Sequence, residues 1–180
     1  IAGIQRFDGQ PVGREVLDAM VATLDHRGPD ANGVELRGSV GLGHTRLSII
    51  DLSGGVQPMV LEDDELVVTF NGEIFNYIEL RQELIAHGRR FATTSDTEVL
   101  LQAYAQWGED CVQHFNGQWA FAIWDARRKK LFLSRDRLGK RPLFYTVSGK
   151  TFLFASEVKA IFAHPGVSKA IDPVGLDQLC

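Results

Sequence analysis

The sequence lacks several features that would place it in a specialised class of protein. It has no apolar run long enough to cross a bilayer and no signal peptide, so neither a membrane partner nor secretion is expected. Its two cysteines, Cys111 and Cys180, give no disulfide framework, which favours the reducing cytoplasm. Repeats and a Pro/Gly/Ser-rich linker are also missing, so we predict one domain over residues 1–180. The net charge of -4 argues against nucleic acid as the main partner.

Several familiar catalytic signatures are missing as well. The five histidines are scattered without metal-ligand spacing, so no metal site is predicted. The Gly149-Lys150-Thr151 segment is not a phosphate-binding loop, because Phe144 stands where the first glycine of that loop is required. No Gly-x-Ser-x-Gly segment occurs. We expect His44 to be a packed or hydrogen-bonded histidine and Cys111 to be a structural cysteine.

The hydrophobic residues, 44% of the 180, are sufficient for a core, and their spacing predicts the secondary structure. The predicted strands are 40–50 with a loop in the middle, 66–70, 118–125, 130–135, 142–147 and 151–155. The predicted helices begin at Arg14, Tyr77, Ser95 and Glu157. The first is predicted to share one apolar face among Leu17, Met20, Val21 and Leu24, and strand 118–125 to bury Trp119, Phe121 and Ile123 on one face. Strands and helices occur in blocks, with hairpin turns such as Ser148-Gly149-Lys150 between strands. This order predicts an α+β fold, with helices packed on antiparallel sheets.

In the stretch from Leu66 to Glu73, polar groups that could bind a ligand follow a predicted strand. Residues 66–70 are apolar or β-branched, as is typical of a strand covered on both faces. Asn71 and Gly72 are predicted to end that strand, and the carboxylate of Glu73 follows. An amide side chain, an unshielded N–H and an acid side by side suit an oxyanion next to an ammonium group. Taken alone, Asn71-Gly72 is also the commonest two-residue hairpin turn.

Three other segments hold polar groups that need an explanation. Arg46 interrupts an apolar run, where its guanidinium needs a carboxylate from a ligand or from a structural ion pair. Asp96 lies in a capping box formed by Ser95 and Glu98, so it either complements the helix dipole or faces a cationic group of a ligand. The His26–Asp30 cluster is dense in turn formers and is either a plain turn or the wall of a site.

Taken together, these segments resemble a known family. The motifs occur along the chain in the order Ile1-Ala2-Gly3-Ile4, His26-Arg27-Gly28-Pro29-Asp30, Arg46-Leu47-Ser48-Ile49-Ile50-Asp51, Asn71-Gly72-Glu73-Ile74-Phe75-Asn76, Ser95-Asp96-Thr97-Glu98 and Ser134-Arg135-Asp136-Arg137-Leu138-Gly139. The order resembles that of the glutaminase domain of class II glutamine amidotransferases. Within that family, the chain is most similar to the N-terminal domain of glutamine-dependent asparagine synthetases, and the similarity covers essentially all of its residues.

The resemblance implies an N-terminal-nucleophile hydrolase fold, a four-layer αββα sandwich of two antiparallel sheets between helices. It also implies hydrolysis of the side-chain amide of L-glutamine to glutamate and ammonia. The Asn71 side chain and the Gly72 N–H would then hold the oxyanion. Arg46 would bind the α-carboxylate, while Glu73 and Asp96 would bind the α-ammonium group. The residues whose backbone would line the same pocket are Leu47, Ser48, Ile49 and Ile50.

In the family, the nucleophile is a cysteine at the mature N-terminus, and the reaction passes through a γ-glutamyl thioester. The terminal α-amine, with a pKa near ~8, can serve as the general base for the thiol. That cysteine is expected just before Ile1, and neither Cys111 nor Cys180 matches it. A chain that starts at Ile1 is therefore expected not to hydrolyse glutamine. The alternative function is a catalytically silent amino-acid-binding or scaffold domain.

The resemblance also implies a partner domain. Residues from about 172 to 180 resemble the entry to a synthetase domain, which would bind ATP, Mg²⁺ and aspartate and would receive the ammonia. No cofactor is expected in the glutaminase domain itself. The ammonia acceptor and the oligomeric state, a homodimer included, stay open at this point.

Overall fold

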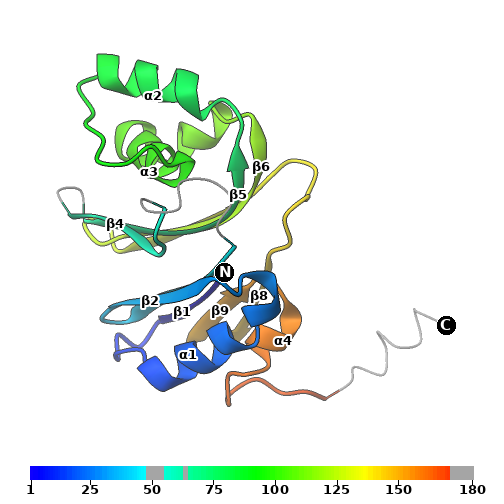
Figure 1. Cartoon of the computed structure of the whole chain (residues 1–180). Helices are drawn as coiled ribbons and strands as arrows, with labels where there is room; N and C mark the ends of the chain where they lie inside the picture. The colour runs from blue at the N-terminus through cyan, green and yellow to red at the C-terminus, as the bar shows by residue number, and fades with distance from the viewer. Residues whose placement is uncertain (48–54, 63–64, 171–180) are drawn as a thin grey trace.

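The computed structural model describes residues 1–47, 55–62 and 65–170. Two β-sheets lie face to face, and helices cover the outer face of each sheet (Figure 1). The start of the chain lies between the two sheets (Figure 1). The predicted four-layer αββα sandwich is therefore confirmed.

The first sheet contains the first strand of the chain, and Ile1, just before that strand, packs between the two sheets. Its strands are β1 (Ala2–Arg6), β2 (Ala31–Arg37), β3 (Val40–Arg46), β8 (Phe144–Ser148) and β9 (Thr151–Ala155). Their order in space is β2-β3-β1-β9-β8, and every neighbouring pair is antiparallel. Because β1 is the central strand, backbone hydrogen bonds to β3 and β9 fix the chain start from both sides.

The second sheet is built around a long antiparallel pair. Its strands are β4 (Met59–Leu61), β5 (Leu66–Ile74), β6 (Gly117–Asp125) and β7 (Lys130–Arg135), in the order β4-β5-β6-β7. The β5–β6 register runs without a break from Leu66 opposite Asp125 to Ile74 opposite Gly117. Strand β5 is therefore paired with β6 along its whole length, up to Ile74.

The helices cover the two sheets in pairs. Helices α1 (Arg14–Ala22) and α4 (Val158–Ile161) pack on the first sheet, and α2 (Tyr77–Ala86) and α3 (Asp96–Trp107) cover the second (Figure 1). The 3₁₀ turns η1 (Asp25–Arg27) and η3 (Gly108–Gln113) follow α1 and α3. As predicted, α1 buries Leu17, Met20 and Val21, and Leu24 is buried just beyond its end. Among the described residues, no helix is long and apolar enough to cross a membrane.

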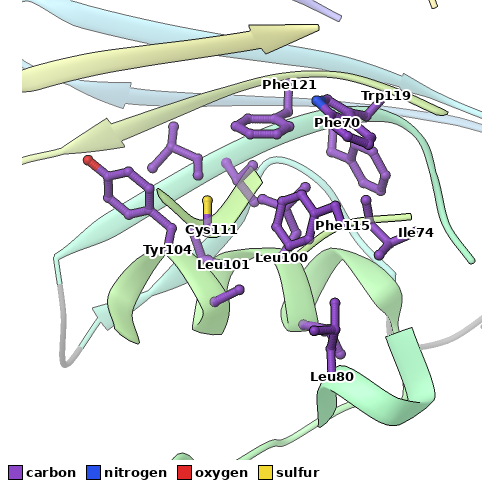
Figure 2. Packing of buried hydrophobic residues seen from close by; sticks show 14 of the residues in the cluster. Phe70, Ile74, Leu80, Leu100, Leu101, Tyr104, Cys111, Phe115, Trp119 and Phe121 are labelled. Atoms are coloured by element: carbon purple, nitrogen blue, oxygen red, sulfur yellow. The ribbon is translucent and has the colours of Figure 1, made fainter. Parts of the chain in front are cut away.

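Hydrophobic clusters lie between adjacent layers. The β5–β6 face that meets α2 and α3 buries Phe121, Leu100 and Tyr104, together with the thiol of Cys111 (Figure 2). The cluster between the two sheets joins Ile1 to residues of both sheets. As predicted, β6 turns Trp119, Phe121 and Ile123 to one side, and its alanines pack on the other. Burial of apolar surface on both faces of β5 and β6 holds the layers together.

Two predictions about strands are wrong. The strand β5 continues through Asn71 and Gly72, so these residues neither end the strand nor form a hairpin turn; they pair with Ala120 and Trp119. The ladder to β6 runs unbroken through both positions, and this long-range pairing outweighs the local turn preference of Asn-Gly. The predicted loop within residues 40–50 is absent over Val40–Arg46, which is one strand paired with β2 along its length and with β1 over Val40–Gly43; residues 48–50 of this prediction lie outside the described residues.

The predicted capping box at α3 is only half correct. The Ser95 hydroxyl oxygen accepts a hydrogen bond from the Thr97 N–H at 3.0 Å, as an N-cap should. The Glu98 carboxylate does not bond back to the Ser95 N–H. It accepts from the N–H groups of Ala92 and Thr93 at 2.8 and 2.7 Å instead. Glu98 therefore fixes the loop that leads into the helix.

Candidate active site

A cavity of about 230 Å³ lies where four separate parts of the fold meet. Its walls come from the chain start, the end of β3, the second half of β5 and the first turn of α3. Arg27 from η1, Arg141 from the connection between β7 and β8, and residues of the connection between β3 and β4, Gln57 included, also line it. The cavity is therefore a product of tertiary structure, built on strands rather than on one loop.

The cavity brings together every predicted site residue that the structure describes. These residues are Arg46, Leu47, Asn71, Gly72, Glu73 and Asp96. The other predicted pocket residues, Ser48, Ile49 and Ile50, lie outside the described residues. The expected convergence of a guanidinium, an amide and two carboxylates beside Ile1 is thus observed, whereas the role of each group stays a prediction.

Strand β5 supplies the amide side chain and the glycine. The Asn71 Nδ2 atom is buried and has no hydrogen-bond partner among the described residues. A side chain at position 72 would collide with the Gln118 carbonyl oxygen and the Trp119 backbone on β6. Position 72 therefore requires glycine, because its backbone packs closely on β6. A buried amide donor that lacks a partner is costly, and a ligand oxygen in the cavity would satisfy it.

The two carboxylates reach the cavity from different elements. Glu73 follows Gly72 on β5, and Asp96 is the first residue of α3. Asp96 is buried, and its Oδ2 accepts a hydrogen bond from the Ile74 N–H at 3.1 Å. Burial raises the pKa of Asp96 above its ordinary value, and the nearby Glu73 carboxylate adds to this rise. A cationic ligand group between these acids would relieve their repulsion.

Arg46 is the last residue of β3, and the predicted turn at residues 26–30 packs against its backbone. The Asp30 N–H donates to the Arg46 carbonyl at 3.1 Å. A side chain at Gly28 would collide with the backbone at Arg46, so the turn can approach the strand only because residue 28 is glycine. Arg27 from the same turn lines the cavity. In this structure, the segment is a wall of the cavity rather than a plain turn.

One carboxylate anchors that wall. Glu157 Oε1 accepts from Arg27 Nη1 at 3.0 Å and lies 2.9 Å from His26 Nε2, while Lys159 Nζ contacts Oε2 at 3.2 Å. Burial opposes the charged form of Glu157, yet hydrogen bonds from Arg27, His26 and Lys159 outweigh it and lower its pKa to about 2. A charged Glu157 therefore holds Arg27 in place at the cavity over the whole neutral pH range.

His44 lines the cavity close to the chain start. It is buried, and its Nδ1 lies 3.5 Å from the hydroxyl oxygen of Thr69, which itself lies 3.0 Å from the Gly43 carbonyl oxygen. Burial is the main cause that lowers the pKa of His44 to about 3, and the positive charge of Arg46 contributes to this shift. The imidazole is therefore neutral at pH 7. Its packed position agrees with the prediction, but its place on the cavity wall was not foreseen.

Gln57 is a cavity residue that the sequence did not reveal. Its Oε1 accepts from the Phe70 N–H at 2.6 Å, and its Nε2 donates to the Thr97 hydroxyl at 3.4 Å. These two partners directly flank Asn71 and Asp96 in the chain. Gln57 therefore ties the strand that carries the amide to the helix that carries the acid. No local pattern around residue 57 marks this role.

Arg141 is the second cavity residue that sequence reasoning missed. It lies in the connection between β7 and β8, and its Nε is buried without a hydrogen-bond partner among the described residues. In the sequence, Asp136 belongs to the motif of residues 134–139, and Arg141 lies two residues after that motif. The presence of a basic residue near that motif was a weak signal, because charged side chains in loops usually face solvent.

The described cysteine is not a nucleophile for this cavity. Cys111 is buried in the cluster under α3, and it does not line the cavity. Burial raises the pKa of its thiol to about 12, so the reactive thiolate is not formed at neutral pH. Its predicted structural role is confirmed. Within the described ranges, no group of three His, Cys, Asp or Glu side chains is placed to hold a metal ion.

The layers and the position of the cavity define a class of protein. Two solved structures share the fold over 90% of this chain and 42% of theirs, each at 23% sequence identity. One is a glutamine phosphoribosylpyrophosphate amidotransferase from B. subtilis, with a TM-score of 0.73, and the other is described as the allosteric regulatory enzyme of purine biosynthesis, with a TM-score of 0.74. The chain therefore has the N-terminal-nucleophile hydrolase fold, as predicted.

Within this class, the chain belongs to the glutamine amidotransferase domain family, whose profile matches residues 1–180. It is 48% identical over 168 residues to asparagine synthetase [glutamine-hydrolyzing] 3 of Bacillus subtilis. This match covers 92% of this chain and 27% of that protein. It is 42% identical over 188 residues to a putative asparagine synthetase [glutamine-hydrolyzing] 2 of Methanocaldococcus jannaschii, covering 94% of this chain and 36% of the relative. The chain thus spans only about a third or less of these relatives.

Proposed function

We propose that this domain hydrolyses the side-chain amide of L-glutamine to glutamate and ammonia. The observation that carries the proposal is the cavity itself, where the Arg46 guanidinium, two carboxylates and a buried amide nitrogen without a partner among the described residues meet beside the chain start. A free amino acid carries a carboxylate and an ammonium group at one end. Glutamine carries an amide at the other end. The groups around the cavity are complementary to both ends.

The amino-acid end would be held by charge. Arg46 donates two parallel hydrogen bonds to the α-carboxylate, the geometry that a guanidinium prefers. Glu73 and Asp96 accept from the α-ammonium group. Burial and the neighbouring Glu73 charge disfavour the charged form of Asp96 and so raise its pKa. The incoming ammonium group would stabilise the charged form of both acids.

The amide end would be held for reaction. A cysteine thiolate attacks the amide carbon, the carbonyl electrons move to the oxygen, and the Asn71 Nδ2 and Gly72 N–H donate to that oxyanion. The amide nitrogen takes the proton that the thiol gave to the terminal α-amine, the carbon–nitrogen bond breaks and ammonia leaves. Water then adds to the γ-glutamyl thioester, which releases glutamate and restores the thiol. We propose that the cysteine lies just before Ile1 in the full-length protein. The burial of Ile1 at the cavity wall supports this position.

The ammonia would serve a synthetase domain, and we infer that the product is asparagine. The support is the identity of 48% and 42% to proteins named as glutamine-hydrolysing asparagine synthetases. In this proposal, ATP and Mg²⁺ bind in the synthetase domain, and residues 1–180 bind no cofactor. Calorimetric titration of ATP into the isolated domain tests this division, and tight binding would contradict it. Sedimentation of the full-length protein tests whether it is a homodimer.

The test of the proposed function is glutamine turnover by the full-length protein. We expect equal release of glutamate and ammonia, and a γ-glutamyl adduct on the N-terminal cysteine in mass spectra of quenched enzyme. Arg46→Met should raise the KM for glutamine about 10- to 100-fold, because hydrogen bonds to charged groups contribute about 1.5–3 kcal/mol. The exposed Arg137→Met variant removes the same charge away from the cavity and should behave as the wild type.

A second function is favoured by one observation. The described cysteine is a core residue, so the same cavity also suits a domain that binds an amino acid without hydrolysing it. Glutamine binding by calorimetry, without turnover and without a thioester in the full-length protein, would select this function. Turnover that disappears on substitution of the N-terminal cysteine would exclude it.

A further inference from the structure

Two buried donors at the cavity lack a partner, and only one of them is used by the proposed function. Within the described ranges, the buried side-chain nitrogens and oxygens without a hydrogen-bond partner are Asn71 Nδ2 and Arg141 Nε. Both residues line the same cavity. Buried polar groups in folded proteins are nearly always satisfied, so a pair of exceptions at one site indicates an acceptor that is supplied by a ligand.

The Arg141 side chain is not needed to shape its own loop. The Asp136 carboxylate accepts from the N–H groups of Leu138, Lys140 and Arg141 at 3.1, 3.0 and 3.1 Å, and Arg135 donates to the Arg141 carbonyl at 2.7 Å. Both backbone groups of Arg141 are therefore used. The loop holds the residue by its main chain and leaves the guanidinium available.

The same loop is tied to the strand that faces the glycine of the site. Asp136 Oδ2 also accepts from the Trp119 N–H at 3.2 Å, and Trp119 pairs with Gly72 on β5. Burial disfavours the charged form of Asp136, but hydrogen bonds from four backbone N–H groups outweigh it and keep its pKa below the ordinary value. A charged Asp136 thus fixes the position of Arg141 relative to the end of β5.

We propose that Arg141 is a further catalytic residue, which donates from Nε to the amide oxygen of bound glutamine. This inference rests on the proposed function. Arg46 already matches the α-carboxylate, and Glu73 and Asp96 match the ammonium group, so the amide oxygen is the acceptor that still gains from a cation. When the thiolate attacks, the carbonyl electron pair moves onto this oxygen. Arg141 stabilises the resulting charge and keeps its proton, because a guanidinium stays charged in proteins.

The experiment compares variants of the full-length enzyme. Arg141→Met keeps the length of the side chain without its donors, and Arg141→Lys keeps the charge without the planar guanidinium. Removal of one oxyanion donor typically lowers kcat by about 10²–10³-fold. We expect Arg141→Met to lower the kcat of glutamine hydrolysis by about 10²-fold, with glutamine Kd changed less than about threefold. Arg141→Lys should recover part of kcat. The control is Arg137→Met, an exposed cation in the same loop, which should retain full activity.

The outcomes are distinct from those of the proposed function. If the wild type hydrolyses glutamine and Arg141→Met has the kcat of Arg137→Met, the inference about Arg141 is wrong and the proposed function stands. A rise in glutamine Kd with unchanged kcat also overturns it, because it indicates contact with the α-carboxylate. Absence of turnover in the wild type removes the proposed function and this inference together. Circular dichroism and the thermal midpoint identify a variant that does not fold, in which case Arg141→Lys decides.

Discussion

The two halves of β5 differ in a way that separates stability from function. From Leu66 to Phe70 the strand is buried on both faces, in clusters shared with the helices and with the first sheet. From Asn71 to Glu73 the same strand keeps its ladder to β6 but turns polar groups into a cavity. One half is satisfied by its own neighbours. The other half leaves Asn71 Nδ2 without a partner among the described residues.

The first turn of α3 repeats this contrast with two acids of the same helix. Glu98 is satisfied by the loop before it, through hydrogen bonds from Ala92 and Thr93. Asp96 accepts a hydrogen bond from the Ile74 N–H and lines the cavity, where burial raises its pKa. The Glu98 carboxylate therefore serves the loop before the helix, whereas the Asp96 carboxylate also faces the cavity. This comparison gives predictions that can be tested one by one.

The largest effect on stability is expected in the core half. Phe121 is fully buried and lies opposite Phe70 in the β5–β6 ladder. Phe121→Ala should lower the free energy of unfolding by about 3–5 kcal/mol, because it removes a buried ring and leaves a cavity. Urea titration followed by fluorescence measures this change. A loss below about 1 kcal/mol would contradict the assignment of this half to stability.

The site half should show the reverse pattern. Asn71→Ala should lower kcat for glutamine hydrolysis by about 10²–10³-fold in the full-length protein. It should change the free energy of unfolding by no more than about 1 kcal/mol relative to the wild type, because the Asn71 Nδ2 donor has no hydrogen-bond partner among the described residues of the ligand-free protein. Asn32→Ala on the exposed face of β2 is the matched control and should change neither quantity. Strong destabilisation by Asn71→Ala would show that the residue is structural.

Asp96 should make glutamine binding dependent on pH. Only the charged carboxylate pairs with the ammonium group, and burial raises the pKa of Asp96. Binding should therefore weaken on acidification at a higher pH than for an ordinary carboxyl. Asp96→Asn should raise Kd about 10- to 100-fold at pH 7 and reduce this pH dependence. Calorimetry across pH checks both, and a variant Kd equal to that of the wild type would remove Asp96 from the site.

His44 should contribute to acid sensitivity of the fold. Its pKa is lowered to about 3 by burial, against an ordinary value of 6.5, so between these limits the unfolded chain binds a proton that the folded chain does not. Its contribution is fully present above pH 6.5 and is lost as the pH falls towards 3, with a slope of up to ~1.4 kcal/mol per pH unit. His44→Asn should flatten the stability–pH curve in this window. His87→Gln, an exposed histidine, should leave the slope unchanged.

The smallest effect is expected at the surface. Arg14 and Asp18 form an ion pair at 3.2 Å on α1, with side chains 65% and 48% exposed. Arg14→Ala should change the free energy of unfolding by no more than about 0.5 kcal/mol, because solvent and salt screen such pairs. It should not affect turnover. An effect on kcat would mean that the contrast between site and scaffold extends to the outer face of α1.

Much of the scaffold was predictable from the sequence because local patterns repeat with the period of each element. The strands Lys130–Arg135 and Thr151–Ala155 have the predicted bounds, and the predicted hairpin turn lies between β8 and β9. The faces of α1 and β6 also agree with the structure. The strand β2 (Ala31–Arg37) was not predicted, since it is held by its ladder to β3 and has little apolar alternation of its own.

The candidate site was predictable only in part. Residues of unusual chemistry in strong local settings, such as Arg46, Asn71 and Asp96, could be found because a charge or an amide in those settings needs a reason. Gln57 and Arg141 could not, because they lie in irregular segments where polar residues are ordinary. Gln57 matters because it bonds Phe70 and Thr97, which are distant in the sequence. Arg141 matters because its buried Nε has no hydrogen-bond partner among the described residues.

The sequence by itself determined the kinds of element, the buried faces and the chemical groups available for a zwitterionic amino acid with an amide. It could do so because helix and strand periods and side-chain chemistry are local properties. The tertiary structure alone decided that β5 continues through Asn71 and Gly72, and that the cavity lined by Asn71 also holds Arg141, whose Nε has no partner among the described residues. The physical reason is that strand pairing and hydrogen-bond satisfaction depend on neighbours that only the folded chain brings together.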